Sequence, residues 1–295
     1  MLIGLLPDGA SANSMLFRSF VPRAPLCDFI DDFWLYEDYA GTHAWERILP
    51  SGTFEMVINL REDELRIYDS SGPRKCRRFG GAVVSGPYGG AFISDTAEEA
   101  ALLGVHFKPG GAFAVFNMPA DEFTNTHIDL PTIWGPAATT LRERLCALSE
   151  PAARFRLLEQ VLMARLVEVP ARHPAINVGL ALLRRTHGRA KVRDLARAVD
   201  LSPRRFTEVF TAEIGLPPKL FGRVQRFQQA AALSRNTENV DWAQLALDCG
   251  YFNQSHLIHE FGEFSGLSPA EFWRHLNALD RAGTHVKRHH LPLAS

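Results

Sequence analysis

The most informative segment of the chain is LSPRRFTEVFTAEIGLPPKLFGR, residues 201–223. It returns 51 residues later as FNQSHLIHEFGEFSGLSPAEFWR, residues 252–274, so that Phe210 and Phe261 occupy equivalent positions. Further upstream, the pair Leu-Ala at 195–196 recurs at 245–246, an offset of 50 that a one-residue change in a turn would produce. Self-similarity at a fixed spacing indicates that one supersecondary unit occurs twice.

The first copy has the pattern of two helices joined by a turn. Residues 192–199 place apolar side chains at helical spacing, and residues 200–201 form the turn. Ser202 is a favourable N-cap for a second helix over 203–214, and Gly215 is a favourable residue to end it. The pattern predicts a helix-turn-helix.

The second helix of this unit has distinct inner and outer faces. Phe206, Val209 and Phe210 share one face and are expected to be buried. A recognition helix presents its N-terminal half to the major groove, where arginine can bridge guanine O6 and N7. The candidate DNA-binding residues of the first unit are Arg204, Arg205, Thr207, Glu208 and Thr211.

The second copy follows the same plan. Residues 242–248 form the supporting helix, residues 249–252 the turn, and a helix capped by Asn253 runs to about residue 264. Exposed side chains there can supply hydrogen bonds to base edges, apolar contact to thymine methyls and phosphate contacts. The candidate DNA-binding residues of the second unit are Asn253, Gln254, Ser255, Ile258 and His259.

One continuous helix is predicted between the two units, over residues 218–235. A helix of this length spans about 27 Å, and successive major grooves on one face of DNA lie ~34 Å apart. A single chain is therefore expected to reach two successive grooves.

The charge is unevenly distributed. Residues 171–295 hold 17 Lys and Arg against 11 Asp and Glu, a balance of +6, whereas residues 1–170 hold 15 against 22, a balance of −7. A basic half in a chain of net charge −1 favours a nucleic-acid partner for that half.

The N-terminal part has a different pattern, in which short β-rich runs are separated by Gly, Ser and Pro. It predicts a small β-barrel or sandwich followed by helices. The expected strands are residues 54–60, 65–69, 82–86 and 100–107, and the expected helices are residues 112–118, 137–149 and 151–169.

We therefore expect an α+β protein with two domains. The predicted division is a β-barrel sensor or dimerisation domain with following helices over 1–170, a DNA-binding domain over 171–280, and a flexible tail over 281–295. Four well-separated cysteines argue against a disulfide framework, and no signal peptide or apolar run of ~18 residues is evident, so a cytoplasmic protein is expected.

The motif GYFNQSHLIHEFGEFSGLSPAEFWR, residues 250–274, resembles the second helix-turn-helix of the AraC/XylS family of bacterial regulators, and the similarity covers roughly residues 172–277. The resemblance implies that both recognition helices bind double-stranded promoter DNA. It also implies that the protein recruits RNA polymerase, as an activator does, or obstructs it. Glu208 departs from the basic or neutral side chain common at its position. The positions that match the DNA-facing ones are Arg204, Thr207, Glu208, Gln254, Ser255, Ile258 and His259.

The N-terminal part resembles a domain attached to such regulators, a cupin-like barrel expected to bind a small-molecule effector or to form a homodimer. The residues that carry this resemblance are 49–60, 84–87, 104–111 and 130–135. Effector-lining candidates are equally good core residues; they are Phe54, Met56, Ile58 and Phe107.

Two other classes of protein stay open. One is a β-barrel small-molecule-binding protein or metalloenzyme with a helical appendage, and the other is a protein-interaction adaptor. A metal site requires clustered histidines and a carboxylate, but residues 1–170 hold only His43, His106 and His127, with no H-x-H pair. We expect no enzyme activity, catalytic residue, metal or cofactor, and no membrane partner.

Overall fold

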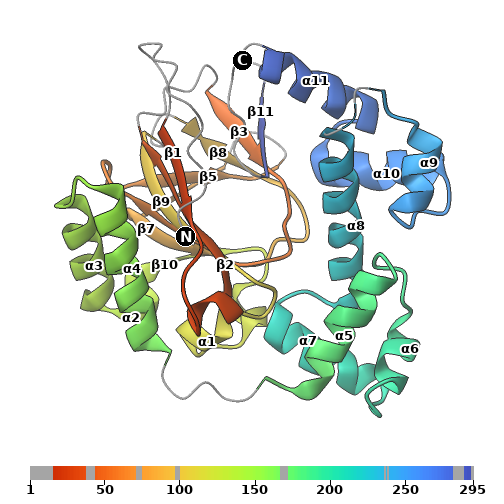
Figure 1. Cartoon of the computed structure of the whole chain (residues 1–295), viewed down its shortest axis with the longest axis horizontal. Coiled ribbons are helices and arrows are strands. Elements are labelled where there is room, and N and C mark those ends of the chain that lie inside the picture. Colours follow the sequence, from red (N-terminus) through yellow and green to blue (C-terminus); the bar gives the residue numbers. More distant parts are fainter. Residues whose placement is uncertain are drawn as a thin grey trace.

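The computed structural model describes residues 16–37, 44–70, 75–96, 100–166, 172–235, 237, 239–281 and 289–293 (Figure 1). Two β-sheets and their covering helices form the N-terminal part, and a column of helices forms the C-terminal part. The predicted α+β class is confirmed. No helix in these ranges is both long and apolar enough to cross a membrane.

The larger sheet is antiparallel and packs helices on one face. The apolar residues that alternate along its strands, such as Phe33, Met56 and Leu103, share one core with Leu141 and Leu158 of the covering helices. In spatial order its strands are β1 (Leu16–Phe20), β2 (Ile30–Glu37), β9 (Ala101–Phe107), β4 (Glu55–Asn59), β7 (Ala82–Ser85) and β10 (His127–Asp129). The helices are α1 (Phe113–Phe116), α2 (Leu130–Trp134), α3 (Pro136–Cys146) and α4 (Pro151–Arg165).

The smaller sheet faces the other side of the larger one. Trp34, Tyr36 and Leu102 of the larger sheet share a core with Leu65 of the smaller sheet, and Phe79 packs against it. The strands of the smaller sheet are, in order, β11 (His290–Pro292), β3 (Trp45–Ile48), β8 (Phe92–Asp95), β5 (Leu65–Tyr68) and β6 (Cys76–Phe79). The two sheets are not joined into a ring among the described strands, so of the two predicted alternatives, a small barrel or a sandwich, the structure has the sandwich.

A row of polar side chains crosses the inner face of the larger sheet. Asp32, His106, Glu55, Ser85 and His127 are successive cross-strand partners in the register of five strands. His106 Nδ1 lies 2.7 Å from Asp32 Oδ1, and His106 Nε2 lies 3.0 Å from Glu55 Oε1. His106 is therefore a strand residue held between two carboxylates.

The four predicted strands are each observed to within two residues, but others were not predicted. β6 (CRRF) is polar and β2 has two aspartates after its first residue, so neither has the apolar alternation on which the prediction rested. The helix predicted over 112–118 is a single turn, because Asn117 adopts a left-handed conformation at φ 52°. The candidate lining residues Phe54, Met56, Ile58 and Phe107 are all buried on the helix-covered face.

The C-terminal tail departs from the prediction. β11 pairs antiparallel with β3, so a flexible tail is wrong for residues 290–292. Leu291 is buried with the C-terminal helices, and this burial holds the strand in place. The predicted boundary at 170–171, residues 282–288 and His43 lie outside the described residues.

Candidate DNA-binding interface

The first helix-turn-helix is formed by α6 (Val192–Arg197) and α7 (Pro203–Ile214), preceded by α5 (Pro174–Arg185). The Ser202 hydroxyl accepts a hydrogen bond from the Arg205 backbone N–H at 3.2 Å, and Gly215 ends α7 at φ 86°, a conformation that favours glycine. Phe206 and Phe210 are fully buried on the inner face. The predicted caps and buried face of this unit are confirmed.

The outer face of α7 carries two arginines and one carboxylate in contact. Arg204 Nε lies 3.0 Å from Glu208 Oε1, and Arg205 Nη1 lies 3.5 Å from Glu208 Oε2. Their side chains are 91%, 61% and 47% exposed for Arg204, Arg205 and Glu208 respectively. The hydrogen bond from Arg204 lowers the pKa of the Glu208 carboxyl group. The ionised carboxylate therefore offsets part of the positive charge of both arginines in the absence of DNA.

The two threonines of this face are half-buried. Thr207 donates its hydroxyl to the Pro203 carbonyl at 2.8 Å, and Thr211 donates to the Thr207 carbonyl at 2.7 Å. Both line a groove of about 700 Å³ with Arg205 and Glu208, and Asp121 of the 3-10 helix η3 (Ala120–Phe123) lines the same groove. The outer face of α7 therefore adjoins the N-terminal domain.

The second helix-turn-helix is formed by α9 (Trp242–Asp248) and α10 (Gln254–Ser265). Asn253 Oδ1 accepts a hydrogen bond from the His256 backbone N–H at 2.8 Å, so this side chain serves as the N-cap. The inner face is buried through Leu257, Phe261 and Phe264. The remaining candidates of this unit, Gln254, Ser255, Ile258 and His259, are all exposed.

The two units differ in charge at equivalent positions. Residues 184–215 contain eight Lys and Arg, whereas the equivalent residues 234–266 contain only Arg235. Lys191 precedes α6 where Asp241 precedes α9, at the offset of 50. At the same offset Arg197 is replaced by Leu247, which is 56% exposed. The first unit therefore has many more lysine and arginine side chains that can contact phosphates than the second unit has.

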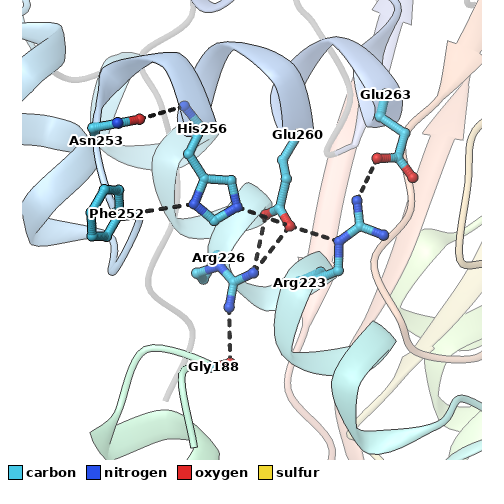
Figure 2. Close-up of polar contacts among 8 residues, drawn as sticks. All are labelled: Gly188, Arg223, Arg226, Phe252, Asn253, His256, Glu260 and Glu263. Atoms are coloured by element: carbon cyan, nitrogen blue, oxygen red, sulfur yellow. Dashed lines mark hydrogen bonds and ion pairs between the residues drawn. The ribbon is translucent and has the colours of Figure 1, made fainter.

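The connecting helix α8 (Pro218–Arg235) has the predicted limits and runs between the two groups of helices (Figure 1). Its polar side chains make contacts that we did not predict from the sequence. Arg223 and Arg226 both donate to the buried carboxylate of Glu260 on α10, as Figure 2 shows. The sequence signal that could have revealed these contacts was Glu260, a glutamate among the apolar residues on the inner face of α10.

The N-terminal domain contacts both units and the connecting helix. Thr124 donates its hydroxyl to the Gly215 carbonyl at the end of α7, and Gln228 Nε2 of α8 donates to the Pro50 carbonyl at 2.6 Å. Arg47 Nη1 donates to the Ser265 carbonyl at the end of α10 at 2.8 Å. The C-terminal ends of α7 and α10 are thus both attached to the sandwich.

Both parts of the chain match models of known families. Residues 195–275 match the model of a helix-turn-helix domain, the span that holds both units described above. The C-terminal part of the chain is an AraC-type helix-turn-helix domain, and the chain is a DNA-binding transcription regulator. Residues 18–129 of this regulator match a domain of unknown function (DUF6597), which spans the sandwich from within β1 to the end of β10.

Solved structures similar to the regulator include the C-terminal domain of AraT, a response regulator from Geobacillus stearothermophilus, at 20% identity over 36% of this chain and 88% of that chain, with a TM-score of 0.33. The DNA-binding domain of AdpA in complex with a target DNA is 26% identical over 38% of this chain and 98% of that chain, with a TM-score of 0.34. ToxT from Vibrio cholerae is 9% identical over 88% of this chain and 98% of that chain, with a TM-score of 0.46. No curated protein matches the regulator.

Within the described residues, no group of three or more His, Cys, Asp or Glu side chains is arranged to hold a metal ion. The described cysteines are all free thiols, and burial raises the pKa of Cys249 to about 11.

Proposed function

We propose that the regulator places α7 and α10 in successive major grooves of promoter DNA, with the candidate residues on their exposed faces making the contacts. The observation that carries this proposal is the pair of capped helices, each with a buried aromatic face and an exposed polar face, joined by one helix of 18 residues. At ~1.5 Å per residue this helix is about 27 Å long, close to the ~34 Å between successive grooves.

The two helices are proposed to contribute differently. Arg204 and Arg205 supply the charge that attracts phosphate and can bridge guanine O6 and N7. Gln254 can pair with adenine, and Ile258, which is 43% exposed, can pack on a thymine methyl. Two recognition helices that differ in this way suit a direct, non-palindromic DNA site.

Alanine substitution at Arg204 or Gln254 tests the reading role. If the side chain contacts a base, the variant should lose discrimination at one operator position by ~1–3 kcal/mol and keep it elsewhere. The measurement is the affinity of each variant for a panel of duplexes that carry single base changes in the site selected from the chain's own upstream region. Weakening by the same factor for every duplex would indicate a phosphate contact only.

We also propose that the sandwich regulates the reader through a small-molecule effector. A cavity of about 410 Å³ lies between the sandwich and the reader, lined by Ser51 and Thr53 on one side and by Gln225, Gln228 and Arg235 on the other. This volume suits a small ligand, and hydrogen-bonding groups on both domains would couple its binding to the position of α8. RNA polymerase and a second copy of the chain are further proposed partners.

A thermal-shift screen of small polar molecules checks the effector proposal. A ligand at about 100 times its Kd should stabilise the full chain by about 2.7 kcal/mol. Ala231 lines the cavity and is 6% exposed, so Ala231→Leu should fill part of it and abolish the shift. A ligand that stabilises Ala231→Leu and the wild-type chain equally would place the effector site elsewhere.

A further inference from the structure

A buried carboxylate joins the second recognition helix to the connecting helix. Glu260 lies on the inner face of α10 and is 5% exposed. It accepts a hydrogen bond from Arg223 Nε at 2.6 Å and from Arg226 Nη2 at 3.1 Å to each of its two oxygens (Figure 2). Because directional bonds from two arginines hold one carboxylate, the rotation of α10 about its axis is restricted.

Arg226 also reaches the first unit. Its Nη1 donates at 2.9 Å to the carbonyl of Gly188, which lies in the turn between α5 and α6. Arg226 as a whole is 8% exposed. The turn approaches α8 closely, since a Cβ added to Gly188 would lie 2.3 Å from the Gly222 carbonyl oxygen. One guanidinium thus bridges the entrance of the first unit and the recognition helix of the second.

The two units also touch directly beside this bridge. A Cβ added to Gly250, in the turn of the second unit, would lie 3.0 Å from the His187 Cβ. His187 Nδ1 in turn lies 3.0 Å from Gln229 Oε1 of α8. The units are therefore packed against each other and are not only connected by α8.

The same carboxylate is linked to the start of the recognition helix. The Phe252 backbone N–H donates to His256 Nδ1 at 3.2 Å, so Nδ1 is an acceptor and the ring N–H is on Nε2. That nitrogen lies 3.5 Å from Glu260 Oε1, as Figure 2 shows. The turn that precedes α10, the inner face of α10 and the first unit are thus connected through Glu260 and Arg226.

We infer that Arg226 and Glu260 are positioning residues that set the distance and rotation between α7 and α10, and so determine which spacing of DNA half-sites the regulator accepts. The inference rests on the proposed reading of two successive grooves. Each added base pair moves the second half-site by ~3.4 Å and rotates it by ~34–36°. A rigid bridge should therefore reject a changed spacing, and a broken bridge should tolerate it.

The test uses the full chain and a duplex selected by the wild-type chain from a randomised library, with one to four base pairs then inserted or removed between its half-sites. Two inserted base pairs should weaken wild-type binding roughly 30-fold, which is less than the ~10³-fold or more that separates specific from non-specific binding. For Arg226→Gln and Glu260→Gln the same insertion should cost only about 3-fold, because the second unit can then follow its half-site.

Two further variants separate positioning from stability. Arg226→Lys keeps a positive charge but lacks the planar fork that bonds both Gly188 and Glu260, so it should tolerate altered spacing as Arg226→Gln does. Arg223→Gln removes one bond to Glu260 but leaves the bridge from Glu260 to the first unit in place, so its spacing profile should lie closer to the wild type than that of Arg226→Gln. Binding of each variant to either half-site alone reports that both units are folded.

The possible outcomes are distinct. If Arg226→Gln and Arg226→Lys bind more weakly by one factor at every spacing, the residues serve stability alone and the inference is wrong. If the affinity of the wild-type chain does not depend on half-site spacing, the proposed reading of two successive grooves is wrong, and the inference that rests on it is wrong too.

Discussion

Replacing His106 by leucine should lower the free energy of unfolding of the N-terminal domain by about 3–5 kcal/mol near pH 6, the usual cost of removing one partner of a buried ion pair. The substitution leaves Asp32 and Glu55 on neighbouring strands without the cation between them. Urea unfolding followed by tryptophan fluorescence measures the change, because Trp34 packs beside the His106 ring at 5.8 Å.

The same site predicts a dependence of stability on pH. Burial lowers the pKa of His106, but the attraction of Glu55 and hydrogen bonds to both carboxylates raise it to about 9. Since this folded-state value lies above the unfolded value of about 6.5, the stabilisation is complete below pH 6.5 and is lost as pH rises through 9. The wild-type chain should lose about 2–3 kcal/mol over this window, and His106→Leu should lose much less.

His127 provides a matched control on the same polar row. Burial lowers its pKa to about 3, and its Nδ1 lies 2.7 Å from the Tyr88 hydroxyl oxygen, so the ring is neutral at pH 7. His127→Leu should cost about 1–2 kcal/mol, the loss of a buried hydrogen bond, and should leave the alkaline loss of stability unchanged. An alkaline loss of equal size in His106→Leu would assign the effect to another group.

Replacing Arg204 and Arg205 together by glutamine should weaken DNA binding about 10- to 100-fold at low salt and reduce the slope of log K against log salt by about 1–2, since each lost phosphate contact removes ~0.9. The effect is expected to be large because these exposed cations lie on the face proposed to meet DNA. Filter binding or fluorescence anisotropy over a range of salt concentrations measures both quantities.

Two controls accompany the double variant. Glu208→Gln removes the carboxylate that pairs with both arginines, so it should strengthen binding and steepen the salt dependence by up to about 1. Ser255→Ala in the second unit, at the position equivalent to Arg204, should leave the slope unchanged. A double variant with the wild-type slope would show that the first unit grips phosphate through other side chains.

The helices of the C-terminal half agreed closely with the sequence because their signals are local. Ser202 and Asn253 cap the helix that begins immediately after them, and Gly215 ends a helix where only a positive φ fits. The apolar spacing that buries Phe206 and Phe261 is read within one or two turns. The exposed faces of α7 and α10 follow directly from these buried ones.

The N-terminal half agreed less well because its strands are stabilised by partners far away in the chain. β11 lies beside β3 although more than 240 residues separate them, and the polar strand β6 is held by its ladder with β5. An open sandwich and a closed barrel have the same alternation of apolar residues, so only the strand pairing distinguishes them.

By itself the sequence determined two copies of a helix-turn-helix, their caps, their buried faces and the helix between them, because each depends on residues less than about five helical turns apart. Only the tertiary structure decided how the two units are joined. The bridge from Gly188 through Arg226 to Glu260 links residues 34 and 38 positions apart. Such a contact exists only after α8, α10 and the α5–α6 turn have packed, since no local pattern specifies which buried charge meets which.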